Sequence, residues 1–215
     1  MVAVVPPGCS CMYVPASFAP PDHASLFDAI ERYSFALLVT GSGCELTASH
    51  LPLLLDRASG EHGTLLGHMA RANGQWREAA SQPVLAIFSG PHAYISPAWY
   101  KAEQVVPTWN YVAVHAYGRL ELIEDAAESE QLLRRTIETY ESGQPRPWQL
   151  NESPEWIGNL VAQIVAFRIP IDRLEGKWKL NQNHPAERRA KVAAALETQG
   201  DENAREIARL MRDGR

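Results

Sequence analysis

Hydrophobic and polar residues alternate most clearly between Val112 and Ile123. Every second residue of this stretch is apolar or small, which is the period of a strand that buries one face. The predicted strand is longer than the usual ~5–6 residues, and long strands that bend are typical of barrels. Gly118 lies within this stretch and is the position where we expect the bend.

Further strands are predicted by short apolar runs that end at glycine, proline or polar turns. They are expected at 35–40, 45–55, 64–69, 83–89, 92–96 and 168–180. The turn at 41–43 predicts a hairpin between the first two of these strands. Pro52 is expected at an edge or a bulge because it cannot donate to a ladder. Gly90 and Pro91 are expected to separate the strand at 83–89 from the next one.

Helices are predicted where apolar residues recur every three or four positions or where a capping residue starts a helical run. They are expected at 25–33, around Trp76, and at 125–141, 154–167, 185–196 and 202–211. Asp125 and Glu128 form a capping-box pattern, and Ser153 is an N-cap candidate before a proline. About seven strands with few intervening helices favour a mainly β fold, an antiparallel barrel with appended helices, over a βαβ unit.

Composition and charge exclude several classes of protein. The chain has 215 residues, 46% of them hydrophobic, and a formal net charge of −5, so no overall field attracts it to nucleic acid or to an anionic membrane. Its longest apolar runs fall far short of the roughly 20 residues that span a bilayer. The N-terminus lacks a secretory signal and the 3 cysteines form no Cys-x-x-Cys pair, so we expect a protein of the reducing cytoplasm.

Patterns that carry well-known chemistry are absent from the sequence. The 7 histidines form neither His-x-His nor His-Glu-x-x-His, so no metal site is expected. His50, His68 and His115 fall on predicted strands and are interpreted as partnered or interface residues, while a general-base role for one of them stays open. There is no nucleophile elbow, P-loop or Gly-x-Gly-x-x-Gly, and no catalytic residue is assigned.

The stretch from Gly67 to Trp76 has the pattern of a strand that passes into a helix. The first backbone N–H groups of a helix lack partners within it, and an arginine beside them can bind a phosphate with two hydrogen bonds. Arg71 and Asn73 therefore suggest an anion site. The alternative is that Asn73 is an ordinary N-cap and Arg71 a solvated surface residue.

Three further segments place flat aromatic side chains beside amide, hydroxyl and cationic groups. They are Trp99–Tyr100, Val105–Tyr111 and Lys177–Leu180. A planar, phosphorylated ligand with polar edges needs such groups. Each segment also has a plainer explanation, because strand aromatics usually belong to the core and lysines can protect an edge strand from aggregation. Together with Arg71 and Asn73, the three segments favour a site for flavin mononucleotide (FMN).

Several short segments resemble those of one known family. They are Met12-Tyr13-x-Pro15, Thr47–Leu55, Gly67–Asn73, Gly90–Ser96, Val106–Tyr111, Val114–Gly118 and Gly176–Leu180. Over the stretch from Met12 to about Leu196, the chain is similar to the PaiB family, the FMN-binding negative transcriptional regulators. The resemblance implies an FMN-binding split β-barrel of the pyridoxamine-phosphate-oxidase-like superfamily, usually a homodimer with flavin sites at or near the subunit interface.

The resemblance also implies which residues contact the cofactor. It places Arg71 and Asn73 on the phosphate side with Ser49 and His50 nearby, Trp109 and Asn110 close to the flavin ring, and Lys177, Lys179 and Gln182 in the same pocket or in the dimer seam. The expected organisation is a disordered leader at 1–11, an FMN-binding split-barrel domain at 12–183 with inserted helices, and a helical tail at 184–215.

The resemblance implies a negative transcriptional regulator, and DNA binding follows from it alone because the sequence shows no helix-turn-helix. The best local candidate for a DNA contact is a group of basic residues in the tail, Arg188, Arg189, Lys191, Arg205 and Arg209, interspersed with glutamates.

Two alternatives to a regulatory function stay open. One is a flavin-dependent oxidoreductase or flavin reductase that acts on a small molecule with NAD(P)H as donor, and the other is a haem-handling split-barrel protein that uses a strand histidine. Truncation after Asn183 is expected to abolish promoter binding and spare the flavin if the tail carries regulation.

Overall fold

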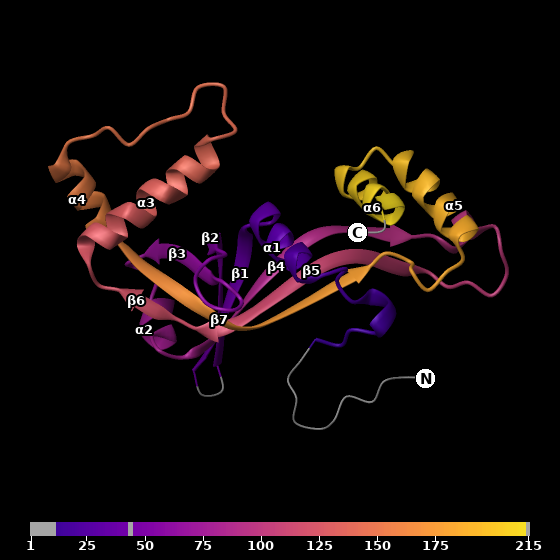
Figure 1. The fold of residues 1–215 in the computed structure, drawn as a ribbon, viewed down its shortest axis with the longest axis horizontal. Helices are drawn as coiled ribbons and strands as arrows, with labels where there is room; N and C mark the ends of the chain where they lie inside the picture. The colour runs from indigo at the N-terminus through magenta and orange to yellow at the C-terminus, as the bar shows by residue number, and fades with distance from the viewer. Residues whose placement is uncertain (1–11, 43–44, 214–215) are drawn as a thin grey trace. The chain divides into compact units, whose positions relative to one another are not determined.

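The computed structural model describes residues 12–42 and 45–213, so the leader expected at 1–11 lies outside the described residues. Its strands are β1 (Phe35–Ser42), β2 (Glu45–Asp56), β3 (Thr64–Ala70), β4 (Pro83–Ile95), β5 (Thr108–Arg119), β6 (Glu121–Ile123) and β7 (Ile164–Lys179) (Figure 1). Its helices are α1 (His23–Arg32), α2 (Gln75–Ala79), α3 (Ala126–Glu141), α4 (Pro154–Ala162), α5 (Ala186–Glu197) and α6 (Glu202–Asp213), with short 3-10 helices η1 (Ala16–Phe18) and η2 (Pro97–Tyr100).

Six strands of the sheet close into a ring. The order β3-β2-β1-β4-β5-β7 is completed by a pairing of β7 with β3, and β6 joins the sheet beside β7. The pairs β1–β2, β1–β4, β2–β3, β3–β7 and β6–β7 are all antiparallel. This is the antiparallel split barrel with appended helices that the sequence predicts.

The chain divides into two compact units. The barrel unit comprises Ser34–Ile87 and Ala116–Leu174 and holds a part of every strand in the ring. The terminal unit comprises the described residues of Met1–Tyr33, Phe88–His115 and Glu175–Arg215. It contains the remaining parts of β4, β5 and β7 together with α1, α5 and α6.

The core of the barrel unit is built from apolar side chains that alternate along its strands. Leu38, Leu53, Leu65, Phe167 and Ile169 are each 0% exposed. Burying such a side chain stabilises the fold by roughly 1.5–3 kcal/mol. Gly118 allows β5 to approach β7 closely, since a Cβ at this position would lie 2.2 Å from the carbonyl oxygen of Pro170.

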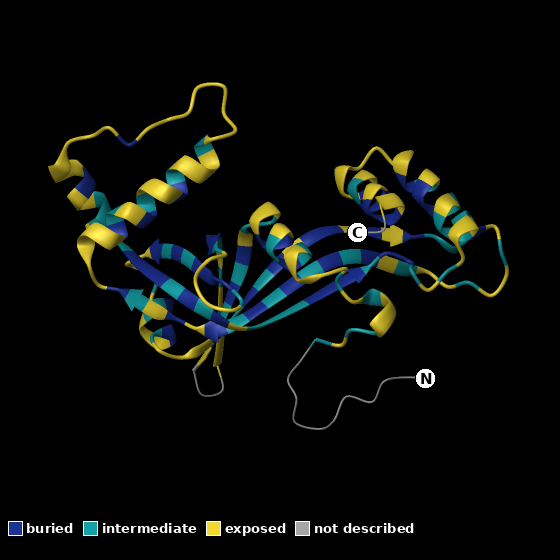
Figure 2. Cartoon of the chain, in the orientation of Figure 1, coloured by how far each residue is buried: buried dark blue, intermediate teal, exposed yellow. Residues whose placement is uncertain are grey.

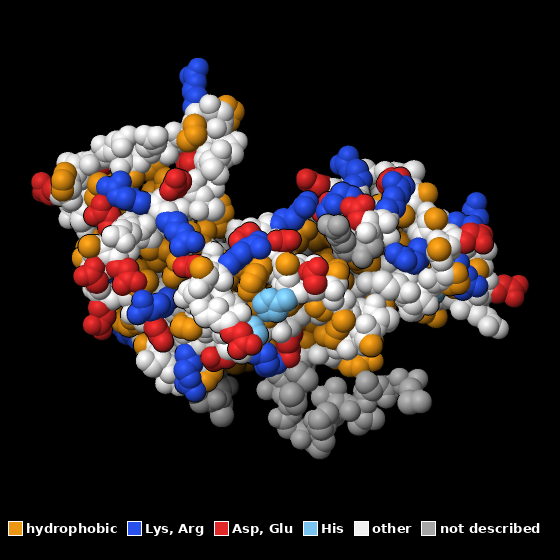
Figure 3. All heavy atoms as spheres, in the orientation of Figure 1, with side chains coloured by type: hydrophobic (Ala, Val, Ile, Leu, Met, Phe, Trp, Pro, Cys, Tyr) orange, Lys and Arg blue, Asp and Glu red, His pale blue; other side chains and the backbone are white. Residues whose placement is uncertain are grey.

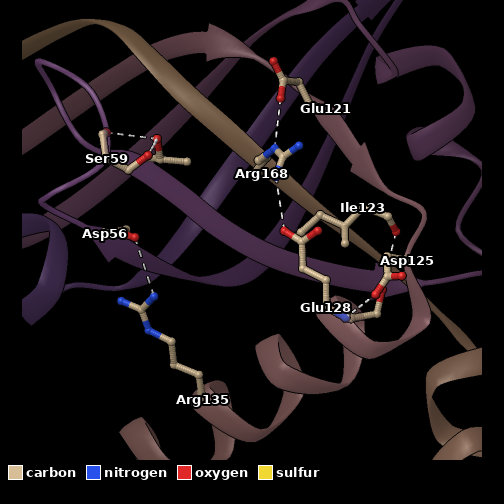
Figure 4. Close-up of polar contacts among 10 residues, drawn as sticks. Asp56, Ser59, Glu121, Ile123, Asp125, Glu128, Arg135 and Arg168 are labelled. Carbon is tan, nitrogen blue, oxygen red and sulfur yellow. Dashed lines mark hydrogen bonds and ion pairs between the residues drawn. The ribbon is translucent and has the colours of Figure 1, made fainter.

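Within the barrel unit, a cap fixes the start of helix α3 and an ion pair joins the helix to β7 (Figure 4). The side chain of Asp125 accepts a hydrogen bond from the backbone N–H of Glu128 at 2.8 Å, as the capping pattern predicts. The Glu128 carboxylate accepts a hydrogen bond from Arg168 at 3.2 Å, and Arg168 also donates to Glu121 at 3.0 Å. One guanidinium on β7 thereby links β6 and α3, although each exposed pair adds little stability by itself.

In the terminal unit, α5 and α6 lie side by side (Figure 1). Both helices bury apolar residues, namely Val192, Ala193 and Leu196 of α5 and Ile207 and Ala208 of α6. The tail expected at 184–215 therefore contributes core residues to this unit.

In the terminal unit, the segments of β4 and β5 have one buried and one more exposed face, as the alternation of dark blue and lighter residues in Figure 2 shows. Ala93, Ile95 and Val112 are buried, whereas Tyr94 and Trp109 are 46% and 53% exposed. The exposed face thus presents aromatic side chains.

Most predicted elements are confirmed, including the hairpin of β1 and β2, helix α3 and both tail helices. Pro52 occupies the last pair of the β1–β2 ladder, opposite Phe35. The break predicted at Gly90 and Pro91 is wrong, because β4 runs through both residues. Every second residue of β4 is buried up to Gly90, as Phe88 and Gly90 show, and again from Pro91 onward, as Pro91 and Ala93 show. The alternation therefore shifts by one residue between Gly90 and Pro91. Such a shift is the signature of a β-bulge, where proline is tolerated.

Two predicted element ends are also wrong. The strand expected at 112–123 begins at Thr108, ends at Arg119, and is followed by the separate strand β6. The helix expected to reach about residue 167 ends at Ala162, and residues 164–167 instead begin β7. Residues 164–170 pair with β3 along its whole length, so this apolar, partly β-branched segment completes the ring.

Candidate cofactor site

A side-chain pair at the end of β3 forms the centre of the candidate phosphate site. Asn73 Nδ2 donates a hydrogen bond to Ser49 Oγ on β2 at 2.9 Å, and Asn73 Oδ1 accepts one from the backbone N–H of Gln75 at 3.1 Å. Ser49 accepts in this contact, and within residues 12–42 and 45–213 its own hydroxyl proton has no acceptor. That O–H group remains able to donate to an anion.

Arg71 has a structural role that the sequence pattern does not reveal. Its Nε donates to the carbonyl oxygen of Ala162 and its Nη2 to that of Ile164, both at 2.7 Å. The guanidinium therefore holds the end of α4 and the start of β7 against the end of β3. Nη1 has no hydrogen-bond partner in the part of the chain that the structure describes, so it is the nitrogen left for a phosphate oxygen.

Helix α2 itself contributes little to anion binding. It has 5 residues, its N-cap is Gly74 rather than Asn73, and no side chain caps it at that position. A helix macrodipole needs several aligned turns to develop its partial charge. Any anion at this junction therefore depends on the side chains of Ser49 and Arg71.

The structure does not bring His50 to this pair. Successive residues of a strand point to opposite faces, so His50 lies on the other face of β2 from Ser49. There it stacks on Phe35, with ring centroids 6.0 Å apart.

Gln75 is a buried polar residue of the site that sequence reasoning missed. It is 3% exposed, and its Nε2 lies within hydrogen-bond distance of three oxygens on β1 and β2. These oxygens are Leu38 O at 3.1 Å, Thr40 Oγ1 at 3.2 Å and Thr47 O at 3.3 Å. Its Oε1 is buried with no partner in the described chain, which leaves an acceptor for a ligand hydroxyl or water. A single glutamine at a helix start carries no sequence signal for such a role.

In the terminal unit, Trp109 and Asn110 point in different directions. Trp109 is 53% exposed and lies beside Tyr94 and His92, with ring centroids 5.9 Å and 6.1 Å away. Asn110 is fully buried, and its Nδ2 donates to the sulfur of Met211 on α6 at 3.5 Å. Trp109 can cover a flat ring, whereas Asn110 supports the packing of α6.

Lys177 and Lys179 lie on the same side of β7, two residues apart. Lys177 Nζ donates to the carbonyl oxygen of Tyr13 at 2.8 Å and lies over the rings of Tyr13 and Tyr111. Lys179 Nζ donates to the hydroxyl of Thr108. Burial and the nearby charge of Lys177 lower the pKa of Lys179 below its usual value.

Gln182 closes the turn that follows β7. Its Oε1 accepts from the backbone N–H of Leu180 at 2.7 Å, and its Nε2 donates to the carbonyl oxygen of Trp178 at 2.6 Å. The neighbouring Asn181 has a left-handed backbone with φ of 61°, and its Nδ2 donates to Tyr100 Oη at 2.8 Å. Both the oxygen and the nitrogen of the Gln182 amide therefore stabilise this turn.

The nine predicted contacts fall into two groups. Ser49, His50, Arg71 and Asn73 belong to the barrel unit, and Trp109, Asn110, Lys177, Lys179 and Gln182 belong to the terminal unit. Within the first group the structure joins Ser49 to Asn73. Within the second group it places Lys177 and Lys179 side by side.

The remaining histidines and acidic residues do not form a metal centre in the described residues, where no three His, Cys, Asp or Glu side chains come close enough together. His68 on β3 has a buried Nδ1 that finds no hydrogen-bond partner among the residues described, and burial lowers its pKa. No helix of the described chain is both long and apolar enough to cross a membrane.

A family model described as "Putative FMN-binding domain" matches residues 12–173. A relative from Bacillus subtilis (strain 168), "Protease synthase and sporulation protein PAI 2", is 35% identical over 94% of this chain and 97% of its own length. The chain belongs to the PaiB family of FMN-binding proteins. FMN is accordingly the cofactor of this family member, as the resemblance in sequence implies.

Solved structures agree on the fold. The flavocytochrome Anf3 from Azotobacter vinelandii is 16% identical with a TM-score of 0.53, covering 75% of this chain and 69% of its own. The FAD and haem binding protein from Mycobacterium smegmatis is 14% identical with a TM-score of 0.54, covering 79% and 77%. At these identities the likeness establishes the architecture alone.

The residues present fit FMN in their chemistry. The barrel unit offers a hydroxyl proton on Ser49 and an uncommitted guanidinium nitrogen on Arg71, and phosphate oxygens accept hydrogen bonds from both kinds of group. The terminal unit offers an exposed indole and two ammonium groups. When bound, FMN supplies a ring that accepts one or two electrons.

Proposed function

We propose that Ser49, Arg71 and Asn73 hold the phosphate of FMN and that the protein acts in the cytoplasm as a homodimeric negative regulator of transcription. The observation that carries the phosphate assignment is the Asn73–Ser49 hydrogen bond, which orients the Ser49 oxygen and leaves its proton for an anion. The regulatory role is supported by membership of the PaiB family, which the similarity to protein PAI 2 shows.

Trp109, Lys177 and Lys179 remain our proposed contacts for the flavin ring and its polar edge. An exposed indole offers a flat apolar surface, and ammonium groups can donate to the ring carbonyls. Asn110 and Gln182 support these residues through packing and turn formation, and His50 adds no contact to the Ser49–Asn73 pair.

An absorbance spectrum of the purified protein, followed by titration with FMN, tests the cofactor assignment. A flavin band that is retained or restored supports it, and protein that neither carries nor takes up FMN contradicts it. A haem band in place of the flavin band would favour the haem-handling alternative, with the strand residue His68 as its first candidate ligand.

The proposed dimer is supported by the aromatic face of the terminal unit. His92, Tyr94 and Trp109 are exposed together on neighbouring strands, and clustered exposed aromatic side chains are typical of interaction surfaces. Sedimentation at micromolar concentration is expected to give the mass of two chains. A single-chain mass contradicts the dimer.

A flavin-dependent oxidoreductase is the second candidate, and the pairing of charges in the tail favours it. Lys191 bonds to Glu187, Arg209 to Glu206 and Asp213, and Arg212 to Glu197. On the face drawn in Figure 3, basic and acidic side chains of the described residues are interspersed. DNA binding usually depends on a concentrated basic surface.

Anaerobic addition of NADH or NADPH separates the two functions. Rapid bleaching of the flavin band supports the enzyme, whereas an unreactive flavin together with a salt-sensitive shift of promoter DNA supports the regulator.

Truncation after Asn183 is unsuitable as a test of DNA binding by the tail because it removes core residues such as Leu196 and Ile207. The double variant Arg188→Glu and Arg205→Glu tests the tail without removing its packing, with the exposed Arg146→Glu as a matched control.

A further inference from the structure

A long connection joins α3 to α4 in the barrel unit (Figure 1). It spans residues 142–153 and has no helix or strand of its own. Two hydrogen bonds hold it against α3. Glu141 Oε2 accepts from the backbone N–H of Trp148 at 2.7 Å, and Arg134 Nη1 donates to the carbonyl oxygen of Leu150 at 2.8 Å. Ordered connections of this length are uncommon in compact domains and are usually functional.

The connection and the end of α3 enclose a cavity of about 430 Å³. Its apolar lining is formed by Ile137, Pro147 and Leu150, and its acidic lining by Glu138 and Glu141. The indole of Trp148 lines the same cavity and is 48% exposed. The cavity has the size of a ligand pocket, for which roughly 300–1,000 Å³ is usual. It therefore combines a flat aromatic surface, an apolar wall and two carboxylates.

The carboxylates of this cavity are not neutralised by nearby cations. Within residues 12–42 and 45–213, Glu138 has no hydrogen-bond or ion-pair partner, and neither has Oε1 of Glu141. Arg134 also lines the cavity, but its nitrogens are engaged. Its Nε and Nη2 contact Glu130 Oε1 at 2.9 Å and 2.8 Å, and its Nη1 holds the connection. Arg146 of the connection lies outside the cavity lining. The site is therefore suited to a cation.

The chemistry of the lining favours an arginine side chain over other cations. In the described part of the chain, no three His, Cys, Asp or Glu side chains come together to hold a metal ion. A guanidinium stacks on an indole and donates two parallel hydrogen bonds to a carboxylate, whereas an ammonium group is a strongly hydrated point charge. The methylene groups of an arginine can lie along the apolar wall.

We propose that the cavity between α3 and residues 142–153 is a docking site for an arginine side chain on a basic segment of a partner protein. Trp148 covers the guanidinium, and Glu138 and Glu141 accept its hydrogen bonds. The formal net charge of −5 on the chain favours a basic partner. None of the residues that we assign to FMN lines the cavity, so this interaction is separate from the cofactor site.

Calorimetric titration of the full-length protein with three short blocked peptides tests the proposal. The peptides carry arginine, lysine or citrulline at the centre of a glycine sequence. We expect the arginine peptide to bind most tightly and the lysine peptide more weakly. The citrulline peptide is expected not to bind, because citrulline has nearly the shape of arginine but no charge. Absence of binding by the arginine peptide, or equal binding of the arginine and citrulline peptides, overturns the proposal.

Two variants locate the binding site. Glu138→Gln, which keeps the shape of the side chain, and Trp148→Leu are each expected to weaken binding of the arginine peptide roughly tenfold. Glu155→Gln and Trp156→Leu are the matched controls, since both residues are exposed on α4 outside the cavity lining, and they keep the parent affinity. Parent affinity in both cavity variants contradicts the proposal. Flavin absorbance and urea midpoints of the same samples show that the variants are folded and distinguish a failure of FMN binding from a failure of peptide docking.

Discussion

Asn73 Nδ2 donates to Ser49 Oγ at 2.9 Å, and this contact ties the segment that follows β3 to β2 at the candidate phosphate site. Because the amide oxygen of Asn73 also accepts the backbone N–H of Gln75, the amide is held at both ends. The position of the Ser49 oxygen is therefore set before any ligand arrives. Such preorganised donors bind anions at a lower entropic cost.

Replacing Ser49 by Ala is expected to weaken FMN binding. A hydrogen bond to a charged group contributes about 1.5–3 kcal/mol, which corresponds to a loss of roughly one to two orders of magnitude in Kd. Fluorescence titration with FMN measures the change. Ser59→Ala, which alters a hydroxyl on a turn of the same unit, serves as the control and keeps the parent affinity. Equal affinities of the two variants would remove Ser49 from the site.

Arg71→Ala is expected to lower both FMN affinity and the stability of the barrel unit. The affinity loss, on the order of 1.5–3 kcal/mol, comes from the charge-assisted contact. The stability loss comes from the carbonyl oxygens of Ala162 and Ile164, which lose their donors. Urea unfolding in the absence of FMN isolates the second effect from the first. An Ala variant with parent stability contradicts the clamp role, whereas one with parent Kd contradicts the phosphate role.

Local sequence patterns predict the elements of this fold well where a capping residue or a clear periodicity marks the element. The capping residue Asp125 and the period of the tail helices lead directly to α3, α5 and α6. The errors arise where a long-range pairing outweighs a local signal. Residues 164–167 continue a helical pattern, but their pairing with β3 places them in β7. Gly90 and Pro91 locally predict the end of a strand, but β4 continues through both residues as a bulge.

The candidate site was less predictable because its residues are defined by contacts between distant segments. Arg71 and Asn73 could be singled out from their residue types, but the partners of Arg71 lie more than 90 positions away. Gln75 carried no signal, since only its burial between β1 and β2 marks it as unusual. The two-residue spacing of Lys177 and Lys179 predicts a shared strand face, whereas the contacts of Lys177 with Tyr13 and of Lys179 with Thr108 are visible only in three dimensions.

Gly118→Ala is expected to destabilise the barrel unit strongly. The added Cβ would lie 2.2 Å from the carbonyl oxygen of Pro170 and 2.8 Å from a methyl carbon of Ile169, so the backbone of β7 has to move. Overpacking of this kind costs about 1–3 kcal/mol or more. Gly158→Ala is the matched control: it lies within α4, has nothing within 4 Å of its added Cβ, and is expected to stabilise by roughly 0.5–1 kcal/mol. Urea unfolding compares the two, and equal midpoints would show that β5 and β7 do not need the close approach.

His68 is expected to make the stability of the protein depend on pH. Burial lowers its pKa below the ordinary value of 6.5, so the unfolded chain binds a proton at a higher pH than the folded chain does. The free energy of unfolding is therefore at its full value above this ordinary pKa and falls as the pH drops through it toward the folded pKa. His184, whose pKa is lowered by burial and by the charge of Arg188, acts in the same direction. Urea unfolding measures how much stability is lost between pH 7.5 and pH 5.5. We expect this loss to be smaller in His68→Gln than in the parent protein. We expect it to be smaller again in the double variant that also carries His184→Gln. A parent-sized loss in the double variant would assign the pH dependence to other groups.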